Sequence, residues 1–224
     1  MEKIEPASKL SFLSKSPISC SLHPVVLFEI LDHFTRRNVD QVRVVGALLD
    51  SVNADGTVNL RNSFPMPHDD TNAQDTPQRP GFEQFFDTML QLHRRVNARE
   101  HLVGWYVTAR ADEDDSSKED IGEEDVQLQA FFESKIGDKH PCVLLHVDAN
   151  IQNAEHIGIS TYTSSILALR ADKNVPESNL GRSFNRVPNV IRTYEAERIG
   201  VDFVTQNTIG YDDELHHGAV DAII

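Results

Sequence analysis

Histidine, cysteine and acidic side chains are the groups from which a metal site or a nucleophilic site could be built in this chain. The sequence has ten histidines and two cysteines. The pair His216-His217 follows Asp212, Asp213 and Glu214 and could take up a metal, although a solvated tail explains the same pattern. Cys142 lies in an expected strand with no base evident, so we interpret it as a small buried apolar side chain. Five histidines fall in expected helices or strands without the spacing that metal ligands need: His23, His33, His93, His101 and His146.

One stretch has the form of a strand that ends where an active site would be placed. Val103 to Val107 is an apolar run with β-branched and aromatic residues, which is typical of a buried strand. Catalytic residues are often carried on loops at such strand ends. Here residues 107–110 are Val-Thr-Ala-Arg, where a hydrolytic metal site would need imidazoles. The strand leads instead into a segment with nine acidic residues between Asp112 and Asp125, and like charges so close together repel one another.

The composition argues against several functional classes. With 224 residues, 39% of them hydrophobic and 25% charged, the chain has an ordinary globular composition. The net charge of −14 argues against strong direct binding to nucleic-acid phosphates, which needs a basic surface. The sequence has no P-loop or GxGxxG motif for a nucleotide, no apolar run that would span a membrane and no secretory signal. Two cysteines without CxxC spacing are typical of reduced thiols, so we expect a cytoplasmic protein.

The first third of the chain predicts one helix and several strands. Residues 1–18 are expected to form a flexible N-terminal arm, followed by a short strand near 18–22. A helix should begin at Pro24, because proline is tolerated in the first turn and apolar residues then recur at helical spacing up to Phe34. A strand over 42–49, a turn signal at 53–56 and a strand over 58–64 predict a hairpin. Residues 65–80 are polar and rich in proline, which predicts a loop.

The clearest helix is expected over residues 82–96. Two interpretations stay open: either the helix is deeply buried in its own domain, or one margin of it faces another protein. On the second interpretation, Phe86 and Leu90 are the predicted partner-facing residues, because they lie on one margin of the apolar stripe. At about 100° per residue, that stripe is broader than one core requires, and it comprises Phe82, Phe85, Phe86, Met89, Leu90, Leu92, His93 and Val96.

The remaining elements alternate between strands and helices. Residues 206–224 are expected to form a C-terminal tail. Because strands and helices alternate but a hairpin lies early, the expected fold is an α/β domain with a mixed β-sheet packed with helices. The predicted elements are strands over 101–107, 142–148, 157–161, 166–169 and 184–194, helices over 123–135 and 195–205, and a loop over 171–182.

Several segments, in this order and spacing, resemble the landmarks of the MPN domain family. The resemblance covers about residues 19–203 and implies a single MPN domain over 19–205 with an acidic loop insert at 111–122. The landmark segments are Leu22-His23-Pro24-Val25-Val26-Leu27, Arg43-Val44-Val45-Gly46-Ala47-Leu48-Leu49, Asn62-Ser63-Phe64 with Pro67, and Val103-Gly104-Trp105-Tyr106.

Catalytic members of this family are zinc isopeptidases, and the resemblance implies that this chain is not one. Those members hold zinc with two histidines two positions apart and an aspartate, which leaves a place for water, and a glutamate on an earlier strand is the general base. In this chain the resemblance leaves Asp125 as the one possible ligand, which cannot hold zinc alone, and puts Arg43 at the position of the base, where an arginine cannot accept a proton at neutral pH. We therefore expect no catalytic residue, no metal and no cofactor. By this resemblance the two histidines, the proline after them, the base, and the serine and aspartate of the motif fall at Val107, Ala109, Arg110, Arg43, near Gly122 and near Asp125.

Two non-catalytic groups within the family are alternatives. Residues 96–100 resemble the non-catalytic MPN subunit of the proteasome regulatory lid. Residues 147–153 and 197–202 are more distinctive and resemble the f-subunit family of eukaryotic translation initiation factor 3, which we favour. That resemblance implies a scaffold that pairs with the MPN-containing h subunit, joins other initiation factor 3 subunits and supports assembly of the preinitiation complex on the small ribosomal subunit. Members of both groups normally continue into C-terminal helices, so we expect either a short member or a truncated chain.

Overall fold

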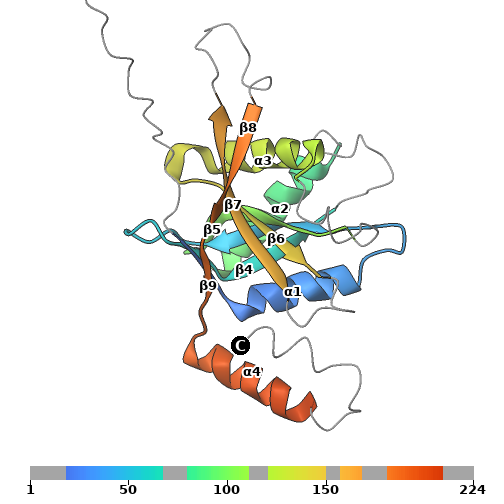
Figure 1. Ribbon diagram of the computed structural model, residues 1–224, viewed down its shortest axis with the longest axis vertical. Coiled ribbons are helices and arrows are strands. Elements are labelled where there is room, and N and C mark those ends of the chain that lie inside the picture. Colours follow the sequence, from blue (N-terminus) through green and yellow to red (C-terminus); the bar gives the residue numbers. More distant parts are fainter. Residues whose placement is uncertain (1–18, 68–79, 111–120, 150–156, 168–180, 209–224) are drawn as a thin grey trace, which may run out of the picture.

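A six-stranded mixed sheet forms the centre of the computed structural model, which describes residues 19–67, 80–110, 121–149, 157–167 and 181–208 (Figure 1). Neighbouring strands run antiparallel except β5 and β6, which are parallel. This arrangement confirms the predicted α/β fold with a mixed sheet. The strand order is β4 (Asn62–Met66), β2 (Val45–Asp50), β5 (His101–Thr108), β6 (Val143–Asp148), β7 (Gly158–Leu167) and β8 (Gly181–Val187).

A small parallel sheet joins three distant parts of the chain. Its order is β3 (Val58–Leu60), β1 (Cys20–Leu22) and β9 (Asn189–Ile191). The predicted hairpin is confirmed, because β2 pairs with β4 and the pairing continues towards the turn, where Val52 bridges Val58 and Asn59 N donates to Ser51 O at 2.9 Å. The other edge of β3 pairs with β1, so this part of the hairpin also belongs to the small sheet. The predicted single strand over 58–64 is divided at Arg61 into β3 and β4. The predicted strand over 184–194 is likewise divided at Pro188, because proline has no N–H for a ladder hydrogen bond.

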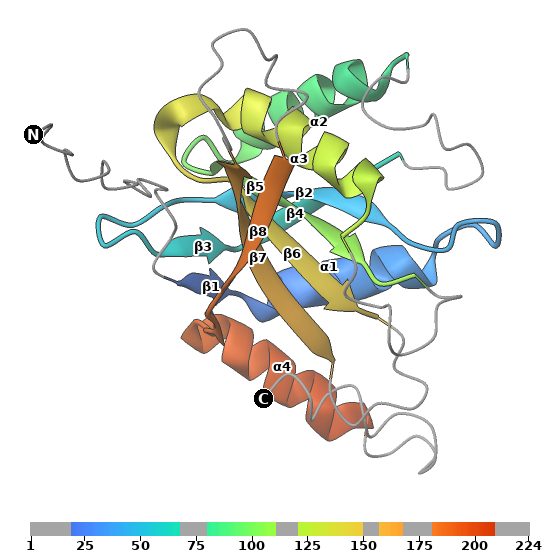
Figure 2. The same cartoon turned by 45° about the horizontal axis from the view of Figure 1, so that its top comes forward.

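Helices cover both faces of the large sheet. In Figure 2, α2 (Phe82–Val96) and α3 (Glu123–Ile136) lie together on one side, and α1 (Pro24–Thr35) lies on the other. These helices and α4 (Glu195–Thr208) confirm the predicted helices, with ends within a few residues. Among the described residues, no helix is long and apolar enough to cross a membrane. The expected N-terminal arm, most of the acidic insert and most of the C-terminal tail lie outside the described residues.

Strand β7 corrects another prediction, because it runs unbroken from Gly158 to Leu167 where two separate strands were expected. The polar residues that suggested a break are accommodated by α3. Ser164 Oγ accepts a hydrogen bond from Gln129 Nε2 at 3.3 Å and donates one to Glu133. Gln129 also accepts a hydrogen bond from Trp105 Nε1 at 2.6 Å, so the same side chain ties α3 to β5.

Two landmark glycines allow close approaches across the sheet. A Cβ at Gly104 would lie 2.0 Å from the backbone oxygen of Val143, and one at Gly46 would lie 2.2 Å from the ring of Tyr106. Both contacts are far inside van der Waals distance. The strands β2, β5 and β6 can therefore pack as they do only with hydrogen at these two positions.

The candidate functional site at the end of strand β5

Three parts of the chain converge at the end of β5: residues 43–44 directly before β2, the end of β5 itself and the first turn of α3. Val45 and Val107 are partners in the β2–β5 ladder. Thr108 N donates to Val44 O at 3.1 Å, and Val44 N donates to Thr108 Oγ1 at 3.0 Å. These bonds extend the pairing past the strand ends and bring Arg43 towards the level of Ala109. The positions that the family resemblance singled out therefore lie together in space.

Arg43 is buried and bonded to two carboxylates of α3. Its Nη1 donates to Asp125 Oδ1 at 2.8 Å, and its Nη2 donates to Glu124 Oε2 at 2.6 Å. Glu124 Oε2 is also 3.5 Å from Arg110 Nη2. The second oxygen of Asp125 accepts a hydrogen bond from Gly122 N at 2.9 Å, which caps the first turn of α3. The insert made the alignment of Asp125 uncertain in the sequence. In the structure, Asp125 lies beside Arg43, close to the position expected for the aspartate of the motif. The sequence reasoning missed the roles of Glu124 and Arg110.

The donor set at this place does not fit a zinc ion. Val107 and Ala109 are buried and offer no donor atom, and the Arg43 guanidinium is a permanent cation. Asp125 is bonded through both carboxylate oxygens. His146 lies opposite Val107 in the β5–β6 ladder, but one imidazole and one engaged carboxylate do not make a zinc site. Across the described residues, no group of three or more histidine, cysteine, aspartate or glutamate side chains is arranged to hold a metal.

The two cysteines are buried and free. Burial raises the pKa of the Cys20 thiol to about 12 and raises the pKa of the Cys142 thiol well above its usual value. Both thiols are therefore protonated at neutral pH and are poor nucleophiles. The interpretation of Cys142 as a buried apolar side chain is confirmed. The pair His216-His217 lies outside the described residues.

Phe86 and Leu90 point into the core of their own domain, contrary to the expectation that they face a partner. Phe86 is 0% exposed and Leu90 is 9% exposed. The Phe86 ring contacts Phe64, Phe131 and Phe132, with centroids 5.9, 5.4 and 5.8 Å away. These two residues lie on the margin of the stripe that the sheet and α3 cover. A partner at the surface of the domain would not reach Phe86.

The other margin of α2 is exposed. Phe85, Leu92 and Val96 are 37%, 49% and 90% exposed, and their spacing of seven and four residues puts them on one line. We call these three residues, with the half-buried Met89 between them, the α2 stripe. The interpretation of a helix buried in its own domain therefore holds for the margin with Phe86 and Leu90, and contact with another protein stays a prediction for the α2 stripe.

The charges that flank the α2 stripe are unequal. At about 100° per residue, the exposed Arg95 borders the stripe, whereas Glu83, Asp87 and Arg94 lie on the far side of the helix. Glu83 and Asp87 bind Lys135 of α3 at 2.7 and 3.1 Å. The carboxylates of the helix are thus bonded away from the stripe, whose solvent-side border carries a positive charge.

Comparison with known proteins identifies the family to which this fold belongs. The family model described as JAB1/Mov34/MPN/PAD-1 ubiquitin protease matches residues 15–132, which is more than half of the chain. The F subunit of eukaryotic translation initiation factor 3 from Dictyostelium discoideum is 35% identical over 204 residues, which cover 91% of this chain and 63% of that protein. The protein of the same name from Phaeosphaeria nodorum is 34% identical over 196 residues, which cover 86% of this chain and 52% of that protein.

The same name is carried by a relative from Arabidopsis thaliana, 29% identical over 209 residues, which cover 93% of this chain and 63% of that protein. The chain therefore spans between about half and two thirds of the length of these relatives. The predicted resemblance to the MPN family, and within it to the f-subunit group, is confirmed. From its mixed sheet, its ordered landmark segments and the match over residues 15–132, the chain belongs to the JAB1/Mov34/MPN/PAD-1 family.

Proposed function

We propose that this chain is a non-catalytic MPN scaffold of the eukaryotic translation initiation factor 3 complex and works in the cytoplasm. The observation that carries the proposal is the ion pair between Arg43 and Asp125, in the place where catalytic relatives need a base and a metal ligand. The family fold is kept around that pair, which is expected if selection maintains surfaces rather than catalysis. The names of the relatives support the assignment to initiation factor 3. As a part of that complex, the chain supports assembly of the preinitiation complex on the small ribosomal subunit.

The α2 stripe is the proposed contact for the other MPN subunit of the complex, the h subunit. Exposed apolar side chains gathered on one face are typical of the buried centre of an interface, and arginine is enriched there. Leu92 and Val96 supply the apolar part, and Arg95 supplies a positive border. The partner surface that fits is apolar and bordered by carboxylates. This assignment replaces Phe86 and Leu90, which the domain itself covers.

Co-purification of the tagged full chain with the complex tests the assembly role. Leu92→Asp should reduce recovery of the h subunit at least tenfold, because it places a charge in the centre of the contact. Arg95→Glu should weaken recovery less, and Arg94→Glu should leave it unchanged because Arg94 projects from the other side of the helix. Unchanged recovery with Leu92→Asp would reject the α2 stripe as the contact. Equal losses with Arg94→Glu and Arg95→Glu would reject its charged border.

Mass spectrometry of the same pull-down separates the two complexes considered from the sequence. We expect initiation factor 3 and small ribosomal subunit proteins, and recovery of proteasome subunits instead would reject the proposal. Residues 96–100, which resemble the proteasome lid subunit, have a structural role here. Buried Glu100 accepts hydrogen bonds from Asn97 Nδ2 at 2.5 Å and contacts His93 Nε2 at 2.5 Å. Any family member with these residues could form this turn, so the turn does not separate an initiation factor 3 subunit from a proteasome lid subunit.

Catalytic inactivity has its own test. The purified chain should contain no stoichiometric zinc and should not cleave a ubiquitin isopeptide substrate, because two ligand positions and the base position lack suitable side chains. A catalytic family member assayed in parallel controls for the substrate. Zinc at one equivalent, or cleavage that a chelator abolishes, would reject the non-catalytic assignment.

A further inference from the structure

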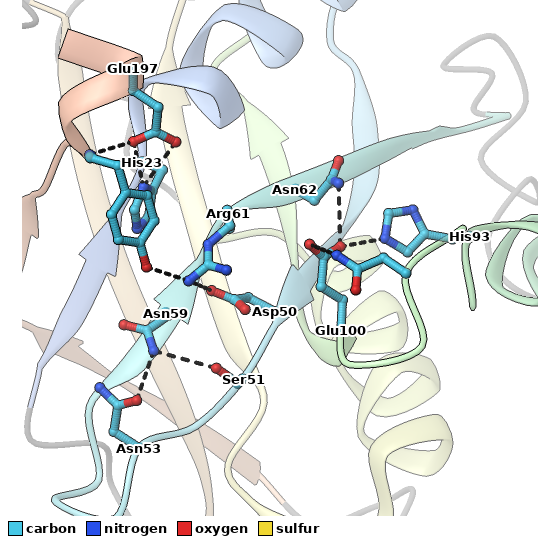
Figure 3. A network of polar contacts seen from close by, with 12 residues as sticks. His23, Asp50, Ser51, Asn53, Asn59, Arg61, Asn62, His93, Glu100 and Glu197 are labelled. Carbon is cyan, nitrogen blue, oxygen red and sulfur yellow. Dashed lines mark hydrogen bonds and ion pairs between the residues drawn. The ribbon is translucent and has the colours of Figure 1, made fainter. Parts of the chain in front are cut away.

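The first turn of α4 meets the start of α1 through a histidine and a glutamate (Figure 3). His23 Nδ1 lies 2.9 and 3.1 Å from the two carboxylate oxygens of Glu197. His23 is 3% exposed, and its ring lies 4.8 Å from the ring of Tyr194, centroid to centroid. His23 and Glu197 belong to the landmark segments 22–27 and 197–202, neither of which contributes to the site at the end of β5 or to the α2 stripe. The fold thus brings together landmarks that lie 174 residues apart.

A second contact joins the same turn to the sheets. The hydroxyl of Tyr194 accepts a hydrogen bond from Arg61 Nη2 at 2.5 Å. Arg61 lies between β3 and β4, and its Nη2 is also 3.4 Å from Asp50 Oδ2 at the end of β2. Both contacts lie within residues 194–197. The position of α4 is therefore set near its first residue.

Among the described side chains of α4, Val201 is the one buried apolar residue. In the described part of the chain, neither of the two hydrophobic clusters that form the core includes a residue of α4. Val201 is buried, whereas Ile199 is 60% exposed. A helix whose described part buries a single apolar side chain can open at a lower free energy than the sheets at the centre of the domain.

We propose that α4 is a hinged element that the His23–Glu197 contact latches against the domain, with the hinge after Arg192, whose N–H donates to Leu22 O at 2.9 Å. Glu197 Oε2 also accepts a hydrogen bond from Tyr194 N at 2.8 Å, which is half of a capping box at the start of α4. One carboxylate therefore both starts the helix and fastens it to His23. When the latch opens, α4 changes direction while both sheets remain paired. A partner that competes for His23 or Glu197 would thereby control where α4 projects.

Hydrogen exchange of the full chain, measured at peptide or residue resolution, tests the latch. His23→Ala should speed exchange of the amides of residues 199–204 about tenfold, the effect of losing one charge-assisted hydrogen bond. Amides of β2 and β5 should exchange at the rate of the unchanged protein. His23→Asn should retain the slow exchange of α4, because an asparagine amide can donate from nearly the position of Nδ1.

Two further variants, Glu197→Ala and Asp32→Ala, complete the test. Glu197→Ala removes both the latch and the cap, so it should speed α4 exchange at least as much as His23→Ala does. Asp32→Ala breaks an exposed ion pair with Arg36 on α1 and should change neither region. The latch is overturned if α4 exchange is unchanged in Glu197→Ala, or if α4 and the sheet accelerate by the same factor. Should His23→Ala fail to fold, His23→Leu takes its place, because leucine fills similar space, cannot donate to Glu197 and leaves the cap at Tyr194 N intact.

Discussion

Two polar junctions of similar length hold two helices in very different ways. Arg43 Nη1 lies 2.8 Å from Asp125, and His23 Nδ1 lies 2.9 Å from Glu197. Around the first junction, α3 places Leu128, Phe132 and Ile136 in the core, so the ion pair is one of many contacts of that helix. Around the second, the described part of α4 adds nothing to either hydrophobic cluster. The apolar surroundings, and not the length of the polar contact, therefore decide whether a helix is fixed or movable.

The largest effect should come from Arg43→Ala. The substitution leaves Asp125 charged and buried without its cation, which costs about 3–5 kcal/mol of the free energy of unfolding for a buried pair. Urea denaturation followed by the fluorescence of Trp105, which is fully buried, measures this loss. Arg110→Ala is the matched control, because Arg110 is partly exposed and meets the cluster at its edge, 3.5 Å from Glu124. A loss below about 1 kcal/mol for Arg43→Ala would mean that water reaches Asp125.

Removing both charges should be far less harmful than removing one. Arg43→Met combined with Asp125→Leu replaces the buried pair with apolar groups, which is often close to neutral. The lost cap at Gly122 N leaves a residual loss of about 1 kcal/mol. The same denaturation experiment on both single variants and the double variant completes the cycle. If the single losses simply add, the two residues do not interact and the contrast between the two junctions fails.

Breaking the other junction should barely change global stability. Glu197→Ala should lower the free energy of unfolding of the sheet by less than about 1 kcal/mol, because α4 is not part of the core that Trp105 reports. The urea transition of Trp105 fluorescence is again the measurement. A loss as large as that of Arg43→Ala would show that α4 unfolds with the sheet.

The smallest expected change in stability comes from Glu29, a half-buried carboxylate whose partner is the hydroxyl of Ser63 and not a cation. Glu29 accepts hydrogen bonds from Ser63 N at 3.0 Å and from Ser63 Oγ at 2.6 Å, yet burial raises its pKa above the usual value. A raised pKa in the folded state favours folding below the unfolded pKa of about 4.3, and that contribution is lost as the pH rises through the folded pKa. Glu29→Gln does not titrate, so its stability relative to the unchanged protein should increase from pH 4 to pH 8. Unfolding measured across this range tests the sign, and a decrease would mean that the ionised form is stabilised.

Much of the fold was predictable from local pattern. The helices over 24–35, 82–96 and 123–136 follow from apolar spacing, because a helix of three or more turns repeats its buried face often enough to be recognised. The central strands β2, β5 and β6 are also recognisable, since they are rich in apolar and β-branched residues. The parallel pairing of β3 with β1 could not be predicted, because the two strands lie far apart in the sequence and no local pattern specifies that partner.

The sequence, through its resemblance to the MPN family, put Val107, Ala109 and Arg43 at the positions of two metal ligands and a base, and the side chain decides which atoms can bind or accept. The three-dimensional arrangement was needed to learn what fills that place, which margin of α2 is covered and that His23 meets Glu197. Helical spacing fixes the angle between side chains but not the direction of the sheet. Contacts between residues 82 or 174 positions apart depend on how the whole chain closes, which no local pattern contains.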